Sequence, residues 1–135
     1  MSMEPAVLIR FDGDASAYQP GDVLAGHYVV EPLEGDSIKA VEVSVLWHTE
    51  GKGDEDMAVH EFWRRDADDV RPIDLREPEQ FVTRLPNSPL SYRGRLIKLH
   101  WCVRVRVFLQ NGKELLGERK FQLGHVPSLK RLAAE

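Results

Sequence analysis

Alternating cationic and titratable side chains near the C-terminus form the clearest candidate for a binding site. They are Lys98, His100, Arg104 and Arg106, here called the basic row. If residues 96–110 are extended, alternate side chains share one face about 6.6 Å apart, and the row spans about 25 Å. Arginine binds carboxylates and phosphates bidentately, so this face predicts contact with an acidic or phosphorylated segment of another protein. Pairing with Glu42 or Glu118 on neighbouring strands is the alternative.

The histidines suggest a metal site, but their spacing does not support one. They are His27, His48, His60, His100 and His125. No two follow the His-x-x-x-His spacing, and Cys102 has no partner in a Cys-x-x-Cys pair. If the strands that carry His48 and His100 pair, these two side chains come close together. A small-molecule or metal-binding sensor or enzyme that uses His48, His60 or His100 therefore stays the alternative function.

No catalytic arrangement is visible in the sequence. Cys102 lies two residues from His100 inside one apolar run, where a side chain is rigid and crowded, so we expect a structural thiol. Neither Gly-x-Ser-x-Gly nor a phosphate-binding loop is present. The acidic residues at 54–56 and 66–69 lack the spacing of a calcium-binding loop and are expected to be solvated. We therefore predict that the protein is not an enzyme and has no catalytic residues, no metal site and no cofactor.

The composition predicts a soluble intracellular domain. The chain has 135 residues, of which 42% are hydrophobic, enough for one core without a disulfide or a metal. Its net charge of −4 argues against nonspecific nucleic-acid binding, which needs a basic surface. A single cysteine fits a reducing compartment. No stretch approaches the roughly 18 apolar residues of a membrane helix, and residues 1–11 lack a signal-peptide pattern. We expect a cytoplasmic protein that does not span a membrane.

Short apolar runs separated by turn residues predict an all-β domain. The expected strands are 6–11, 23–31, 41–48, 58–65, 80–85, 96–110 and 113–123. About seven sequential strands, each with one apolar face, suit a two-sheet antiparallel immunoglobulin-like sandwich. We expect one domain over 1–135, with its core at about 5–124 and a tail at 125–135. The tail is expected to be a short helix or disordered, and residues 66–79 a loop.

The alternation of apolar residues predicts which faces point inward. The longest run has seven apolar residues at alternate positions from Ile97 to Leu109, a pattern that a helix would spread around its axis. In the strand at 58–65, Val59 and Trp63 are expected to share one face. Asn111-Gly112 predicts a type I′ hairpin turn between the last two strands.

Three blocks of the sequence resemble the N-terminal domain of arrestins. Residues 18–26, Tyr-Gln-Pro-Gly-Asp-Val-Leu-Ala-Gly, resemble the family segment Y-x-P-G-[DE]-x-x-x-G, and 38–43 look like the strand that follows it. Residues 85–94, leading into 97–101, are similar to the block with the pattern P-x-x-x-P-x-S-[FY]-x-G. The resemblance covers most of residues 5–124. It extends to the retromer arrestin-like subunit and to sporulation-control proteins, here as a single-domain version.

The resemblance implies an arrestin N-domain-like fold and a function in partner binding. We therefore expect a noncatalytic adaptor or scaffold domain that binds another protein through a sheet face or an open edge. A homodimer through an edge strand is a further expectation. The chain has no tandem lysine pair in its first strand and no recognisable buried charged switch. The resemblance therefore does not imply sensing of phosphorylated receptors.

Overall fold

The computed structural model describes residues 5–31, 38–53, 55–68 and 70–124, and most of these lie in strands. The strands are β1 (Ala6–Phe11), β2 (Ala17–Tyr18), β3 (Val23–Glu31), β4 (Ile38–Gly51), β5 (Met57–Asp66), β6 (Glu79–Arg84), β7 (Tyr92–Arg93), β8 (Ile97–Leu109) and β9 (Glu114–Leu123). All seven predicted strands are present. The additional strands β2 and β7 contain two residues each, too few to show an alternating pattern.

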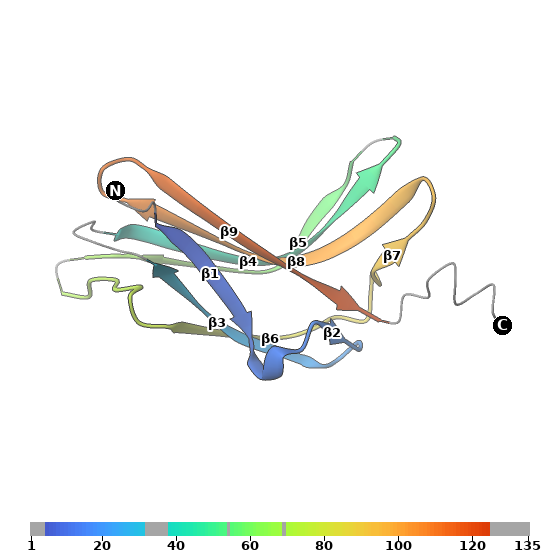
Figure 1. Ribbon diagram of the computed structural model, residues 1–135, viewed down its shortest axis with the longest axis horizontal. Helices are drawn as coiled ribbons and strands as arrows, with labels where there is room; N and C mark the ends of the chain where they lie inside the picture. The colour runs from blue at the N-terminus through green and yellow to red at the C-terminus, as the bar shows by residue number, and fades with distance from the viewer. Residues whose placement is uncertain (1–4, 32–37, 54, 69, 125–135) are drawn as a thin grey trace.

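Two sheets pack face to face (Figure 1). The smaller sheet has the order β1-β3-β6, with both pairs antiparallel. The larger has the order β2-β9-β8-β4-β5, and β7 also pairs with β8. Its pairs are antiparallel except for the two-residue contact of β2 with β9, which is parallel. The predicted all-β, two-sheet sandwich is confirmed, with this short parallel contact as the one departure within the described residues.

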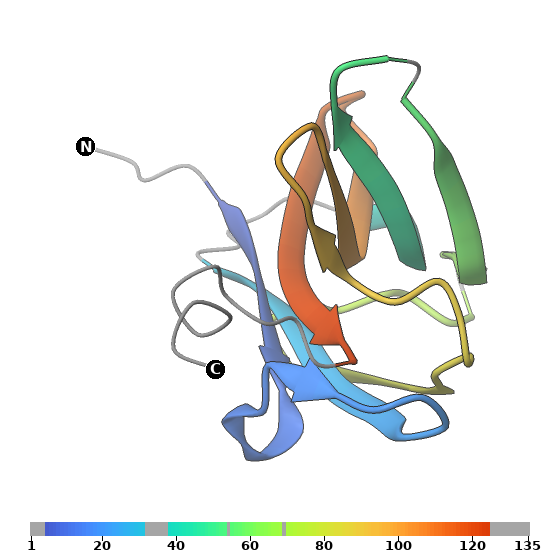
Figure 2. The ribbon, with the colours of Figure 1, turned by 90° about the vertical axis from the view of Figure 1, so that its right-hand side faces the viewer.

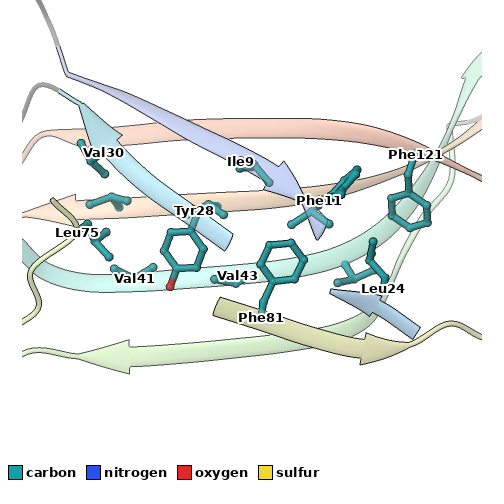
Figure 3. Close-up of a cluster of buried hydrophobic side chains, with 14 of the residues drawn as sticks. Ile9, Phe11, Leu24, Tyr28, Val30, Val41, Val43, Leu75, Phe81 and Phe121 are labelled. Carbon is teal, nitrogen blue, oxygen red and sulfur yellow. The ribbon is translucent and has the colours of Figure 1, made fainter. Parts of the chain in front are cut away.

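The core lies between the sheets and is filled by the inward-pointing residues of the strands (Figure 3). Along β8, the side chains at positions 101, 103, 105 and 107 are at most 1% exposed. Phe11 is the centre of an aromatic group, with edge-on contacts at centroid distances between 6.0 and 6.4 Å to Tyr18, Phe81 and Phe121. Edge-to-face geometry is favourable for such rings, so this group joins β1 to β6 within the smaller sheet and to β2 and β9 of the larger one.

The larger sheet continues past the end of the smaller one. The inner face of β8 is buried at Trp101, half-buried at Leu99 and 46% exposed at Ile97. On β4 the inner face changes in the same way, from Val45, which is 0% exposed, to the half-buried Trp47. Figures 1 and 2 show the β4–β5 and β7–β8 hairpins bending away from the smaller sheet. We call this part, residues 47–51, 57–59 and 90–100, the overhang.

A β-bulge corrects the predicted faces of β5. Val59 pairs with Leu46 and Trp63 pairs with Val43, but the register shifts between Val45 and Leu46. A bulge places one extra residue in a strand and so reverses its alternation. Trp63 packs against the core, whereas Val59 is 48% exposed. The prediction that Val59 and Trp63 share one face is therefore wrong.

The turn between β8 and β9 lies where Asn111-Gly112 predicts it, but it is not of type I′. Only Gly112 has a positive φ, of 89°, whereas a type I′ turn requires two such residues. The Gly112 N–H donates to the Leu109 carbonyl at 3.1 Å, and the Leu109 N–H donates to the Lys113 carbonyl at 2.9 Å. This arrangement matches a type I turn that ends in a left-handed glycine. It sets the register of the whole β8–β9 pair.

The predictions for the loop and the tail have different outcomes. The described residues of 67–78 form no helix or strand, as expected, yet Leu75 is buried and its carbonyl accepts the Val30 N–H at 2.8 Å. Residues 125–135 lie outside the described residues, so the nature of the tail and the domain limits stay predictions. Nowhere in the described residues is there a helix with the length and hydrophobicity needed to cross a membrane.

Candidate functional site

The basic row lies on the outer face of the larger sheet, and β9 neutralises its C-terminal half. Arg104 Nε donates to Glu118 Oε1 at 2.8 Å, and Arg106 Nε donates to Glu114 Oε1 at 2.7 Å. Cross-strand pairing therefore occurs with Glu118, whereas Glu42 pairs with an arginine of β5 and not with the row. A partner that binds Arg104 and Arg106 would have to displace two carboxylates. Binding of a partner to these two arginines stays a prediction.

Cations from two neighbouring strands join the N-terminal half of the row. Arg93 on β7 lies opposite Lys98, and Lys120 on β9 lies opposite Cys102. Facing residues of paired strands share one side of a sheet, so all of these cations lie on the same outer face as His100. Within the described residues, no carboxylate lies within 4.0 Å of the side-chain nitrogens of Arg93, Lys98 or Lys120. We call Arg93, Lys98, His100 and Lys120 the cationic cluster.

Glu50 is the acidic neighbour of the cationic cluster. Its Oε2 lies 2.9 Å from Nε2 of His100. The pKa of Glu50 is lowered below its ordinary value, first by the hydrogen bond with His100 and then by the positive charges of His100, Lys98 and Lys120. The Glu50 side chain is 59% exposed, and exposed ion pairs contribute little to stability.

The structure brings together two of the three histidines considered for a metal or ligand site. The rings of His48 and His100 have centroids 5.4 Å apart, as expected if β4 and β8 pair. His60 lies elsewhere, with Nε2 at 2.8 Å from the Arg84 carbonyl oxygen. His125 lies outside the described residues. Among the residues that the structure describes, no group of three or more His, Cys, Asp or Glu side chains is placed to hold a metal ion.

Cys102 is fully buried in β8, between Leu46 of β4 and Lys120 of β9. Burial, and to a smaller extent the charge of Glu118, raises the pKa of its thiol to about 11. A reactive cysteine needs access to solvent and a lowered pKa. The geometry therefore favours the structural role that the sequence predicts.

The Cys102 thiol is expected to stay protonated and unreactive in the folded protein at neutral pH. Its pKa rises from 9.0 to about 11 on folding, so between these values the folded state binds more protons than the unfolded state. The stability that comes from burying a protonated Cys102 thiol is therefore fully present below pH 9 and is lost as the pH rises through 11. Titration with an aromatic disulfide reagent should show complete reaction only in denaturant. Rapid reaction of the folded protein would contradict this prediction.

Comparison with known proteins establishes the fold. No protein-family model matches the chain, and no curated protein matches it. Among solved structures, the chain is similar to Spo0M, sporulation control protein, from Bacillus subtilis, with a TM-score of 0.64 and 17% sequence identity. The fold is arrestin-like. The match covers 90% of this chain and 49% of Spo0M, so the chain spans about half the length of that protein.

A second solved structure shares the architecture but carries a different name. The superoxide reductase (neelaredoxin) from Ignicoccus hospitalis matches with a TM-score of 0.51 and 9% identity, over 88% of this chain and 80% of that chain. At such identities both likenesses establish the fold alone, because one fold can host unrelated functions. Function must therefore be argued from the surface of this chain.

Two members of the cationic cluster, Arg93 and Lys120, are absent from the basic row predicted from sequence. Lys120 follows Glu118 by two residues, so a hairpin at Asn111-Gly112 that pairs Arg104 with Glu118 also places Lys120 on the outer face. That signal was available in the sequence. Arg93 gave no comparable signal, because β7 is only two residues long.

Proposed function

We propose that this domain is a noncatalytic adaptor or scaffold module that binds another protein through the overhang. The observation that carries the proposal is the exposed apolar face of the overhang, where Tyr92, Leu96 and Ile97 are 58%, 64% and 46% exposed. Contiguous apolar surface on a soluble protein marks an interaction site. The fold shared with a sporulation control protein also supports a regulatory role. A cytoplasmic location stays a prediction from the sequence.

The β7–β8 hairpin defines the chemistry of the partner. Residues 90–100 contain Arg93, Arg95 and Lys98 but no aspartate or glutamate, in a chain whose net charge is −4. A partner segment with large apolar side chains flanked by acidic residues would match this hairpin in both respects. An extended segment can also pair with a strand at the edge of a sheet. We therefore propose an acidic, apolar segment of another protein as the occupant.

Replacing Tyr92 and Ile97 by threonine is expected to weaken partner binding at least about tenfold, because a few large anchors carry most of the energy of an interface. Threonine retains strand propensity, so the fold should persist. Affinity capture from the native cell identifies the partner, and titration with the purified partner measures Kd. The matched control is Val82→Thr/Leu116→Thr, which changes residues that are 60% and 57% exposed outside the overhang and should bind like wild type.

Equal binding of the partner by the two double variants would overturn the assignment to the overhang. Sedimentation of the protein alone tests the predicted homodimer. A dimer that is lost in Tyr92→Thr/Ile97→Thr but kept in the control would mean that a second copy occupies the overhang. That result would also contradict a partner of different sequence at this surface.

The alternative function, a metal-binding or small-molecule sensor or enzyme, rests on the outer face of the overhang and not on its exposed apolar residues. The observation that favours it is the 5.4 Å separation of the His48 and His100 rings, together with Glu50 at 2.9 Å from His100. Imidazole and carboxylate groups are ligands for zinc, copper, nickel and iron. Elemental analysis of protein purified without added metal tests the metal-binding form of this alternative. A stoichiometric metal that is lost in His48→Ala/His100→Ala would favour the alternative.

A further inference from the structure

A pocket of about 230 Å³ lies where β7 and β9 both meet β8. Its polar lining comes from Ser16, Ser91, Arg93, His100, Lys120 and Gln122. Sites for drug-sized ligands usually occupy about 300–1,000 Å³, so this pocket suits a small ion or a single side chain of a partner. Half of its lining belongs to the overhang, namely Ser91, Arg93, Leu99 and His100, but it contains none of the exposed apolar residues at 92, 96 and 97.

The cations of the pocket come from three strands, and two of these cations have no carboxylate partner within the described residues. Arg93, His100 and Lys120 belong to β7, β8 and β9. Within the described residues, Arg93 and Lys120 form no ion pair, in contrast to Arg104 and Arg106 on the same face. An unpaired ammonium and an unpaired guanidinium at one pocket attract an anion and can donate charge-assisted hydrogen bonds to it.

The neutral lining adds hydrogen-bond donors. The Ser91 Oγ accepts the Leu123 N–H at 2.8 Å, so its own proton remains free to donate to a ligand. The Ser16 carbonyl accepts the Gln122 N–H at 2.8 Å, which holds Ser16 beside β9. The Gln122 Nε2 donates one of its two protons to the Gly124 carbonyl at 2.8 Å. Its second proton, like those of the serine hydroxyls, can meet an oxygen of a bound anion.

We propose that this pocket binds a phosphate group, either as free phosphate or on a phosphorylated side chain of a partner. Guanidinium, ammonium and hydroxyl donors from several directions suit a tetrahedral anion better than a planar carboxylate, which has only two oxygens. The inference goes beyond the proposed function: the pocket shares Arg93 with the charged residues of the β7–β8 hairpin, but the exposed apolar residues at 92, 96 and 97 lie outside it. Glu50 holds His100 in the unliganded protein and competes with the anion for it.

Titration of isotope-labelled protein with inorganic phosphate, followed by two-dimensional NMR, tests the proposal. We expect saturable shift changes at residues 91–93, 98–100 and 120–122, with sodium chloride at matched ionic strength as the blank. Arg93→Gln/Lys120→Gln should weaken binding at least about tenfold, because it removes two charged donors. Arg104→Gln/Arg106→Gln is the matched control, since it removes the same charge from the same face and should bind like wild type.

Equal weakening in the two double variants, or no saturable change in wild type, would overturn the proposal. Glu50→Gln provides a gain-of-binding test and should tighten phosphate binding, since it removes a competing carboxylate. An unchanged or weaker affinity in Glu50→Gln would contradict an anion beside His100. A capped Ala-phosphoserine-Ala peptide separates the two sources: binding at least about tenfold tighter than inorganic phosphate supports a phosphorylated partner, and equal or weaker binding supports the free anion. Binding in wild type supports the pocket even if no protein partner is found.

Discussion

Replacing Trp101 by alanine is expected to lower the free energy of unfolding by about 4 kcal/mol, the cost of removing a large aromatic side chain from a packed core. Trp101 is 1% exposed. Its ring centroid lies 5.8 Å from that of Phe121 and 6.2 Å from that of His60. The indole N–H also donates to the Pro89 carbonyl at 2.7 Å. The side chain thus joins β8 to β9, to β5 and to the segment before β7. Urea denaturation monitored by circular dichroism measures the change.

Two further variants separate the causes of this loss. Trp101→Phe keeps an aromatic ring but leaves the Pro89 carbonyl without its donor, and about 1–3 kcal/mol should be lost. Trp47→Ala removes the same kind of side chain from the overhang, where it is only half-buried. Because Trp47 buries less apolar area on folding than Trp101 does, Trp47→Ala should lower the free energy of unfolding by only about 1–2 kcal/mol. Similar losses of stability for Trp47→Ala and Trp101→Ala would mean that Trp47 is as well buried as Trp101. Other protein would then have to cover the overhang.

Local sequence pattern predicts the strands well, because each strand buries one of its two faces. The alternating run from Ile97 to Leu109 correctly predicts β8 and the side of it that faces the core. The same run does not reveal that Ile97 is exposed while Trp101 is buried. Alternation reports which side of a strand is apolar, whereas burial depends on how far the opposite sheet extends. The overhang is therefore a tertiary property that the sequence pattern alone does not show.

The candidate site shows the same division between local and tertiary information. The sequence predicts an outward-facing basic row and the approach of His48 to His100, because both follow from strand pairing. It does not distinguish Arg104, which Glu118 neutralises, from Lys120, which has no ion pair within the described residues. That distinction depends on the register across β9. The pocket depends further on β2 and β7, which are too short to predict.

The second large effect is expected at Gly26, the last residue of the block at 18–26. Gly26 is buried in β3 and pairs with Phe11 of β1 and Phe81 of β6. A Cβ atom at this position would lie 2.3 Å from the Arg10 carbonyl oxygen and 2.7 Å from Cζ of Phe81. The carbonyl belongs to the backbone of β1 and cannot move without shifting the strand. Gly26→Ala is therefore expected to cost about 3 kcal/mol of stability, at the upper end of overpacking effects.

Thermal and urea unfolding of Gly26→Ala measure this cost against a control in the same strand. Ala25 precedes Gly26, is half-buried and faces the opposite side of β3. Ala25→Val adds two methyl groups there and should change stability by less than about 1 kcal/mol, since Ala25 is only half-buried and its β6 partner Val82 is 60% exposed. If Gly26→Ala were as stable as Ala25→Val, β1 would have to move away from the added Cβ atom without a loss of stability. The aromatic group around Phe11 would then not be tightly packed.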